Sequence, residues 1–240
     1  KFVVDIMKEM GYDAIGLGNH EFDFGTPHLT KLVEENGLPV ANMNLRSLHP
    51  DSLFFTPYII KDFGGKKIAF VGVVTPESLI SEAYSFFDKQ GKQMLSLCED
   101  NLVDEVQKTV NEARKAGAHY VILLSHLGEA SAKNFLTSHR LVSSTRGIDV
   151  VLDGHTHSRI PCETVLNADG DTVLLSQTGS RFKNVGKLVI RPDGRMSTEL
   201  IPVDSIKQES AHIRQVTDSI EAMMAKVTTN KICHSDYRMD

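Results

Sequence analysis

The sequence predicts an α/β fold, because short apolar segments typical of buried strands alternate with segments of helical periodicity. Three of the apolar segments, residues 13–17, 121–124 and 148–152, are each followed directly by polar residues. In open α/β sheets, ligands bind outside the carboxyl ends of the strands. The shared placement of the three polar clusters therefore indicates one functional site at one edge of the sheet.

The N-terminal part of the chain predicts two helices and two short strands. Apolar residues at helical spacing predict a helix over residues 2–10, with Gly11 as its C-terminal cap. Residues 13–17 form the first predicted strand, residues 27–36 a second helix, and residues 38–42 a further short strand. Helices and strands thus alternate from the start, as an α/β fold requires.

The middle of the chain predicts a hairpin, a helix and two buried strands. Residues 58–62 and 67–74 are strand-like and are joined by two glycines, which is typical of a β-hairpin. Apolar residues between positions 102 and 113 lie at helical spacing. Residues 121–124 are wholly apolar, and residues 148–152 form another buried strand. Such strands are typical of a sheet that is covered on both faces.

The C-terminal part of the chain predicts antiparallel strands and a final helix. Strands are predicted at residues 173–176, 185–190 and 196–203, with a Pro-Asp-Gly turn at residues 192–194 between the last two. Apolar residues at helical spacing predict an amphipathic helix over residues 213–227. The all-β pattern therefore follows the alternating part and precedes a terminal helix.

The composition argues against two classes of partner. The chain has 240 residues, of which 41% are hydrophobic and 24% are charged, as in ordinary globular domains. Its net charge is −5 and no cluster of basic residues occurs, so direct binding to nucleic acid is not expected. The sequence has no apolar run of about 18 residues, the length that a membrane-spanning helix needs. The composition gives no indication of the oligomeric state.

The polar cluster at residues 18–23 allows two interpretations. Asn19 and His20 after a strand suit a turn, since asparagine tolerates the left-handed conformation. Asp23, however, lies three residues after His20, close enough to hydrogen-bond its ring and fix its tautomer. A histidine oriented in this way suits acid–base catalysis or the stabilisation of a transition state. The cluster alone leaves both interpretations open.

Histidines follow the other two buried strands. His126 ends one strand, and in isolation it could be an ordinary core histidine. His155 and His157 form an H-x-H pair in a glycine-containing loop. Either the loop is simply exposed to solvent, or it directs both imidazoles to one place, where they could bind a metal ion. Together with Asn19 they form a nitrogen and oxygen set without thiolates, which favours a hydrolytic metal centre over a structural zinc site. A pair of such metals can clamp the attacking and leaving oxygens of a phosphoryl transfer.

These residues resemble a known family. The segments Gly-Asn-His-Glu-Phe-Asp at residues 18–23, Ser-His-Leu-Gly at 125–128 and Gly-His-Thr-His at 154–157 are similar to motifs of the calcineurin-like metallophosphoesterases. The order of the motifs resembles the branch that contains 5′-nucleotidases, UDP-sugar hydrolases and 2′,3′-cyclic-nucleotide phosphodiesterases. Residues 41–44 and 176–179 are similar to weaker landmarks of that branch. The resemblance covers about residues 1–203.

The resemblance implies a four-layer α-β-β-α sandwich that holds two divalent metal ions of the Zn or Mn type. It implies that Asn19, His126 and His155 ligate one metal and that His157 ligates the other. It also implies that His20, held by Asp23, stabilises the phosphate in the transition state. The reaction would be hydrolysis of nucleotides or other small phosphoesters by attack of a metal-activated water. The same branch is mostly periplasmic, secreted or surface-exposed.

Two parts of the family pattern do not match this sequence. The branch begins with a strand that carries Asp-x-His and continues with a Gly-Asp motif, and neither occurs before residue 18. Residues 1–203 are thus expected to form a catalytic domain without its first strand or strands. Residues 204–240 are expected to form a linker helix, and no counterpart of the family's C-terminal substrate domain follows.

The missing carboxylates predict a weakened site. Neutral ligands can hold one ion, but a second ion beside it would face unscreened repulsion. We therefore expect mostly single-metal occupancy, impaired hydrolysis by this chain alone and marginal stability. Two alternatives remain open: a truncated remnant or binding module without catalysis, and a cyclic phosphodiesterase on the same scaffold.

Overall fold

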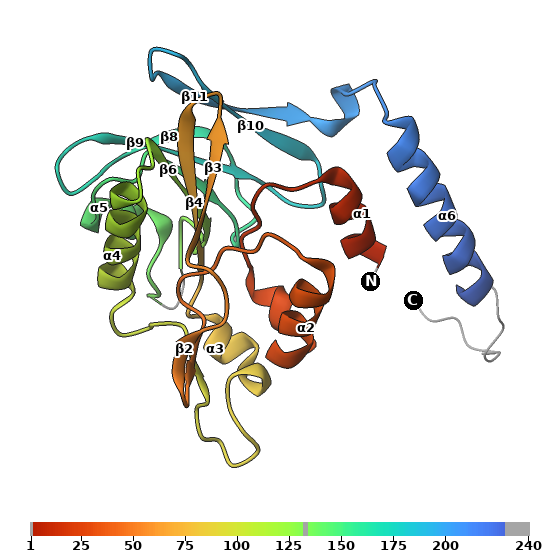
Figure 1. The fold of residues 1–240 in the computed structure, drawn as a ribbon, viewed down its shortest axis with the longest axis horizontal. Helices are drawn as coiled ribbons and strands as arrows, with labels where there is room; N and C mark the ends of the chain where they lie inside the picture. Colours follow the sequence, from red (N-terminus) through yellow and green to blue (C-terminus); the bar gives the residue numbers. More distant parts are fainter. Residues whose placement is uncertain (1, 132–133, 229–240) are drawn as a thin grey trace. The chain divides into compact units, whose positions relative to one another are not determined.

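The computed structural model describes residues 2–131 and 134–228, and these residues form two units. One unit comprises residues 13–206 and contains nearly all of the secondary structure (Figure 1). The other combines residues 1–12 with residues 207–240. The first unit ends at residue 206, and the domain boundary between residues 203 and 204 stays a prediction. The sequence did not predict, however, that residues 1–12 would group with the C-terminal helix.

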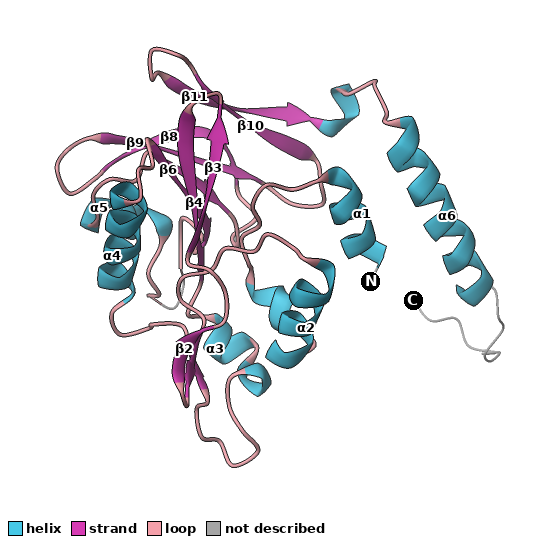
Figure 2. Ribbon diagram, viewed as in Figure 1, coloured by secondary structure: helices cyan, strands magenta, loops and turns pink. Residues whose placement is uncertain are grey.

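The main unit is built on a six-stranded mixed sheet with the order β3-β4-β6-β7-β9-β8 (Figure 2). The inner strands β4, β6, β7 and β9 are parallel, and the edge strands β3 and β8 pair antiparallel to their neighbours. The strands are β3 (Tyr58–Phe63), β4 (Lys66–Val74), β6 (Tyr120–His126), β7 (Val150–Asp153), β8 (Arg159–Leu166) and β9 (Thr172–Thr178). All four parallel strands therefore direct their carboxyl ends to the same edge of the sheet.

One face of this sheet is covered by the helices α4 (Leu102–Lys115) and α5 (Ser138–Ser144) (Figure 1). The apolar stripe of α4 is buried against the strands, as its helical periodicity predicts. The core on this face contains Val71, Val106, Val110, Leu123, Leu141 and Val151, each fully buried. Packing in this core holds β6 in place, and His126, its last residue, therefore lies at the carboxyl edge of the sheet.

The other face carries a second β layer. The hairpin β10 (Asn184–Ile190) and β11 (Met196–Pro202) packs through Leu188, Ile190 and Met196 on Ile68, Ile122 and Val150 of the sheet. The chain around Ile15 and Val40 extends this layer, and α2 (Thr26–Asn36) covers it through Leu29 and Val33. The order helix, sheet, β layer, helix is the predicted α-β-β-α arrangement.

The predicted strands at residues 13–17 and 38–42 are extended but barely paired. Ile15 and Val40 form a single parallel bridge, in which Ile15 N–H donates to Pro39 at 2.9 Å. The ladder stops because Met43 N–H bonds to Gly72 O at 2.9 Å instead of continuing along the first segment. The sequence indicated the extended conformation correctly, but it could not show that the later partner lies in β4.

Several small elements complete the main unit. A three-stranded sheet of order β2-β1-β5 contains β1 (Arg46–Leu48), β2 (Asp51–Leu53) and β5 (Leu95–Ser96). The short helices are η1 (Asn19–Phe22), α3 (Ser78–Ser81), η2 (Ala83–Ser85) and η3 (Val203–Ser205). These short sheets and helices, together with α5 and β8, are elements that the sequence analysis did not predict, because they are too short or too polar to show a clear period.

The second unit consists of α1 (Phe2–Met10) and α6 (Ala211–Thr228), which contact each other. His212 Nε2 and Glu9 Oε2 form an ion pair between them at 2.7 Å. Both helices were predicted from the spacing of their apolar residues. The predicted last residues, 10 and 227, lie at or next to the observed ones, Met10 and Thr228. Across residues 2–131 and 134–228, no helix combines the length and the apolar character needed to cross a membrane.

Candidate metal centre

The functional side chains gather at the carboxyl edge of the parallel strands. His126 is the last residue of β6, and the loop after β7 carries His155 and His157. Glu77 follows β4, and Gln177 lies near the end of β9. Because the four strands are neighbours and parallel, their ends bring residues that are up to 100 positions apart in the chain to one place.

His126 is enclosed by two glycines and one asparagine. Its Nε2 lies 3.1 Å from Asn19 Oδ1, so the turn at residue 19 and the end of β6 meet at this ring. A Cβ added to Gly18 would lie 2.8 Å from His126 Cε1, and one added to Gly154 would lie 2.8 Å from its Nδ1. A side chain at either glycine would therefore overlap the imidazole, so both positions need glycine to make room for it.

The ring of His126 also contacts the H-x-H loop. The centroids of His126 and His155 are 5.3 Å apart in an edge-on arrangement. His155 Nε2 lies 3.3 Å from the carboxylate Oε2 of Glu77. Both His155 and His157 have positive φ angles, 79° and 58°, which non-glycine residues adopt uncommonly. The loop thus holds two histidines in a costly conformation beside His126.

The electrostatics of the cluster keep His126 uncharged. Burial lowers the pKa of His126 to about 4, and the nearby His155, His157 and His20 add to this lowering. A histidine with this pKa is neutral throughout the neutral range, so a ring nitrogen lone pair is available to a metal ion.

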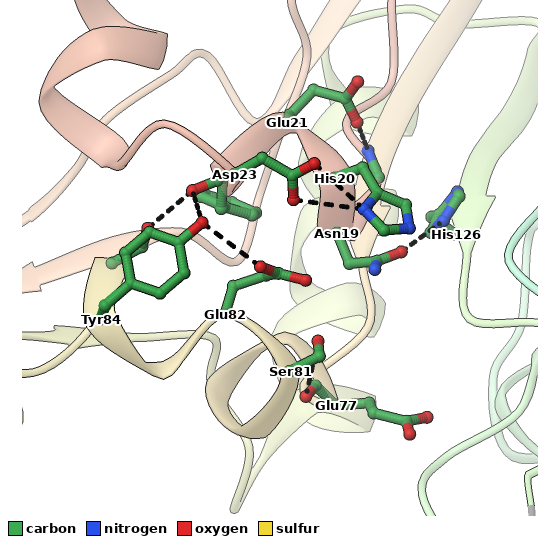
Figure 3. Close-up of polar contacts among 12 residues, drawn as sticks. Asn19, His20, Glu21, Asp23, Glu77, Ser81, Glu82, Tyr84 and His126 are labelled. Atoms are coloured by element: carbon green, nitrogen blue, oxygen red, sulfur yellow. Dashed lines mark hydrogen bonds and ion pairs between the residues drawn. The ribbon is translucent and has the colours of Figure 1, made fainter. Parts of the chain in front are cut away.

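His20 and Asp23 form a pair at the open side of this cluster (Figure 3). His20 Nδ1 lies 3.2 Å from Asp23 Oδ1 and 3.3 Å from Oδ2, so the predicted contact between ring and carboxylate is present. The His20 side chain is 73% exposed, which leaves its outer nitrogen accessible to a ligand. An exposed imidazole held by a carboxylate has the geometry of an acid–base or anion-stabilising group.

Glu82 adds a second carboxylate beside this pair. Ligand atoms of His20, Asp23 and Glu82 all lie within 4.8 Å of one another, and Glu82 is only 8% exposed. Tyr84 Oη lies 3.4 Å from Glu82 Oε2 and donates to the backbone oxygen of Phe22 at 3.0 Å (Figure 3). A divalent ion could therefore also bind at this group, next to the histidine cluster.

The turn that carries Asn19 and His20 is anchored by Phe22. This side chain is fully buried and packs on Phe86 with ring centroids 4.9 Å apart. Its backbone oxygen also accepts a hydrogen bond from the Ser85 hydroxyl at 2.7 Å. Anchoring by Phe22 fixes the position of the turn, and Glu21 Oε2 accepts from Gly18 N–H at 2.6 Å at its start.

The donor set fits the divalent metal that the family resemblance implies. Asn19 offers an amide oxygen and His126 a neutral imidazole, and the two atoms already face each other at 3.1 Å. His155 and its neighbour Glu77 add a nitrogen and a carboxylate at the same edge. Nitrogen and oxygen ligands without thiolate suit catalytic Zn²⁺ or Mn²⁺ centres. Glu77 is a carboxylate beside this cluster that the sequence analysis had not identified.

Several residues of this site were missed from the sequence, although most of them follow a strand. Glu77 comes three positions after the predicted strand that ends at Val74, just as the other polar clusters follow their strands. Glu129 comes three positions after His126, and Asp153 directly follows the predicted strand at residues 148–152, whereas Glu82 follows no predicted strand. Burial raises the pKa of Asp153, although hydrogen bonds from Ser138, Gly154 and Gly128 oppose this effect.

Comparison with known proteins supports the family resemblance. The chain is 31% identical over 170 residues to a 2′,3′-cyclic-nucleotide 2′-phosphodiesterase/3′-nucleotidase of Haemophilus influenzae. This alignment covers 66% of this chain and 25% of the relative. It is also 31% identical over 162 residues to a snake venom 5′-nucleotidase of Gloydius brevicauda, covering 65% and 25%. No family model matches the chain.

A solved structure agrees with the fold. The calcineurin-like phosphoesterase YfkN from Bacillus subtilis superposes with a TM-score of 0.73 at 21% identity, covering 94% of this chain and 74% of that one. These comparisons bear out the predicted resemblance: the relatives are named as nucleotidases and a cyclic-nucleotide phosphodiesterase, and the fold is that of the calcineurin-like phosphoesterases. The relatives are phosphoester hydrolases by name, and the chain spans about a quarter of the length of these two curated relatives.

Proposed function

We propose that this chain carries the metal-dependent hydrolytic site of a 5′-nucleotidase-type phosphoesterase. The observation that carries the proposal is the convergence of Asn19, His126 and His155 at one edge of the sheet, with His20 and Asp23 beside them. Nucleotides are the proposed substrates because the relatives are named for them. Residues 1–203, of which residues 13–203 lie in the main unit, would form the catalytic domain.

In this proposal Asn19, His126 and His155 hold one divalent ion, and His157 contributes to a second. When bound, such ions lower the pKa of a coordinated water and offset negative charge on a phosphoryl group. His126 can serve as a ligand because its pKa of about 4 leaves it neutral. The carboxylate of Glu77, 3.3 Å from His155 Nε2, would orient that ring or share in binding.

His20 is proposed to act on the substrate itself. Its ring contacts Asp23 through Nδ1, so Nε2 is the atom that faces an incoming phosphate. A proton held at Nε2 would stabilise charge that develops on a phosphoryl oxygen or on the leaving group. Asp23 would accept from Nδ1–H and so hold the ring with Nε2 directed toward the substrate. The exposure of His20 is consistent with direct contact to a substrate.

A cyclic phosphodiesterase activity is a second candidate, because one of the relatives is named as a 2′,3′-cyclic-nucleotide 2′-phosphodiesterase/3′-nucleotidase. The same arrangement of ligands could serve both reactions, since each breaks a phosphorus–oxygen bond by attack of water. Three of the relatives are snake venom enzymes by name, and a secreted or surface location is therefore part of the proposal.

The proposal predicts hydrolysis that depends on both metal and His20. The chain is incubated with Mn²⁺ or Zn²⁺ and with AMP, 2′,3′-cyclic AMP and bis-p-nitrophenyl phosphate, and product release is measured with and without EDTA. We expect release that EDTA abolishes and that His20→Ala lowers by about 10²-fold. His49→Ala, at an exposed histidine outside the cluster, is the control and should keep the full rate.

Two outcomes would count against different parts of this proposal. If no phosphoester in the panel is hydrolysed with any metal, the proposed hydrolytic function is wrong, and a binding role without catalysis is favoured. If hydrolysis requires metal but His20→Ala leaves the rate unchanged, the site stands and the role given to His20 is wrong. The ratio of AMP to cyclic AMP turnover decides between the two candidate reactions.

A further inference from the structure

The loop that carries His155 and His157 needs support from outside itself. Both residues have positive φ angles, 79° and 58°. Non-glycine residues adopt this conformation only where surrounding contacts hold them in it. His157 is exposed, so packing of its own side chain provides little of that support. The supporting contacts must therefore come from the residues between and beside the histidines.

Those residues are Thr156 and Ser158, and both bind the same carboxylate. The Thr156 hydroxyl donates to Glu129 Oε2, and the Ser158 hydroxyl donates to Glu129 Oε1. Each oxygen of one side chain thus holds one hydroxyl of the loop. The two hydroxyls flank His157 and follow His155 in the sequence, so their capture limits how the backbone at both histidines can turn.

The buried side chain of Gln177 contacts the same loop and Glu129. Gln177 is 1% exposed, and its Oε1 accepts from the backbone N–H of Ser158 at 2.6 Å. The same oxygen lies 3.1 Å from the Thr156 hydroxyl, and Gln177 Nε2 lies 3.5 Å from Glu129 Oε2. Glu129 is therefore connected both to the loop and to the fixed end of β9.

Gly128, the residue before Glu129, lets the chain pass close to the loop that carries the two histidines. Gly128 has a φ of 78°, and a Cβ at this position would lie 2.6 Å from Thr156 Cγ2. Its N–H donates to Asp153 Oδ1 at 3.2 Å. Only glycine allows the segment after β6 to pass this close to the loop after β7. The carboxylate of Glu129 is thereby delivered to Thr156 and Ser158.

We propose that Glu129 is a positioning residue that holds residues 154–158 in the conformation that aims His155 and His157 at the metal centre. The inference rests on the proposed function for its metal, but the contacts that carry it do not involve any of the proposed ligands directly. Glu129 acts through the two hydroxyls, and it sets the affinity of the site by fixing the geometry of the loop.

The test compares Glu129→Ala with the conservative Glu129→Gln. Alanine removes both acceptors, whereas glutamine keeps one acceptor for one hydroxyl and can donate to the other. Glu112→Ala, at an exposed glutamate of α4, is the matched control. Each variant of the full chain is studied first by hydrogen–deuterium exchange without metal, and then by calorimetric titration with Mn²⁺. Ser158→Ala, which removes one of the two hydroxyls, serves if Glu129→Ala does not fold.

We expect Glu129→Ala to raise exchange at residues 154–158 selectively and to weaken Mn²⁺ binding by about 10- to 100-fold. Glu129→Gln should recover most of the affinity, and Glu112→Ala should match the unaltered chain in both measurements. Unchanged exchange in Glu129→Ala, or unchanged Mn²⁺ affinity, would overturn the inference. If the unaltered chain binds no Mn²⁺, the proposed metal function fails, while the exchange data still decide whether Glu129 holds the loop.

Discussion

Replacing Gly72 with alanine is expected to prevent stable folding of the main unit. Gly72 lies inside β4, where the segment after Val40 crosses the sheet. A Cβ at this position would lie 1.8 Å from Ala41 O and 2.5 Å from Ala41 C, and both of these are backbone atoms. No rotation of a side chain can relieve such an overlap. The two β layers would have to separate locally.

Relief by backbone movement is also costly here. Met43 N–H donates to Gly72 O, and Ala41 N–H donates to Ile15 O, each at 2.9 Å. Moving either segment breaks hydrogen bonds between buried backbone groups and opens the core around them. We therefore expect a loss of more than about 4 kcal/mol in the free energy of unfolding, which is exceptional for one substitution.

Urea denaturation followed by circular dichroism measures this loss. Gly186→Ala in β10 is the matched control, because its Cβ would meet only the methyl carbon of Thr178, at 3.0 Å. That methyl group can shift, so the control is expected to unfold near the midpoint of the unaltered chain. A Gly72→Ala protein that unfolds at the same urea concentration as the control would contradict the close contact between the two β layers.

Gly154→Ala is expected to impair metal binding while the fold is kept. Its Cβ would lie 2.8 Å from His126 Nδ1 and 3.3 Å from Cε1. The overlapping atoms belong to a side chain, so the imidazole can rotate away without disturbing the sheet. Rotation would separate His126 Nε2 from Asn19 Oδ1, which are now 3.1 Å apart. The two proposed ligands would then no longer face a common ion.

Calorimetric titration with Mn²⁺ measures the consequence. We expect affinity to fall by at least about 100-fold, since loss of one ligand exceeds the usual effect of an outer-shell change. Thermal unfolding of the metal-free variant should remain close to that of the unaltered chain. Gly186→Ala again serves as the control and should bind Mn²⁺ normally. Normal affinity in Gly154→Ala would mean that His126 is not a ligand.

The gathering of these side chains at one edge was largely foreseeable because each of them follows an apolar segment. His126, His155 and Asn19 each come directly after an apolar segment, and parallel strands bring such positions together whatever their separation in the sequence. Glu77 follows β4 in the same way and could have been included by the same rule. The hydrogen-bonded pair of His20 and Asp23 was foreseeable from their spacing alone.

The supporting residues were not foreseeable, for a physical reason. Glu129 binds Thr156 and Ser158 across two loops, and Gln177 reaches them from β9. These contacts depend on tertiary packing, and no period or spacing in the sequence encodes them. The same holds for the lone bridge at Ile15, where an apolar run predicted a strand but Met43 pairs with Gly72 instead.

The most direct test of the metal centre is to locate the ion itself. Crystals of the chain grown with Mn²⁺ are measured at a wavelength where manganese scatters anomalously. We expect a peak within about 2.3 Å of Asn19 Oδ1 and of ring nitrogens of His126 and His155. A peak bound only by His20, Asp23 and Glu82, or no peak near either group, would contradict the proposed centre.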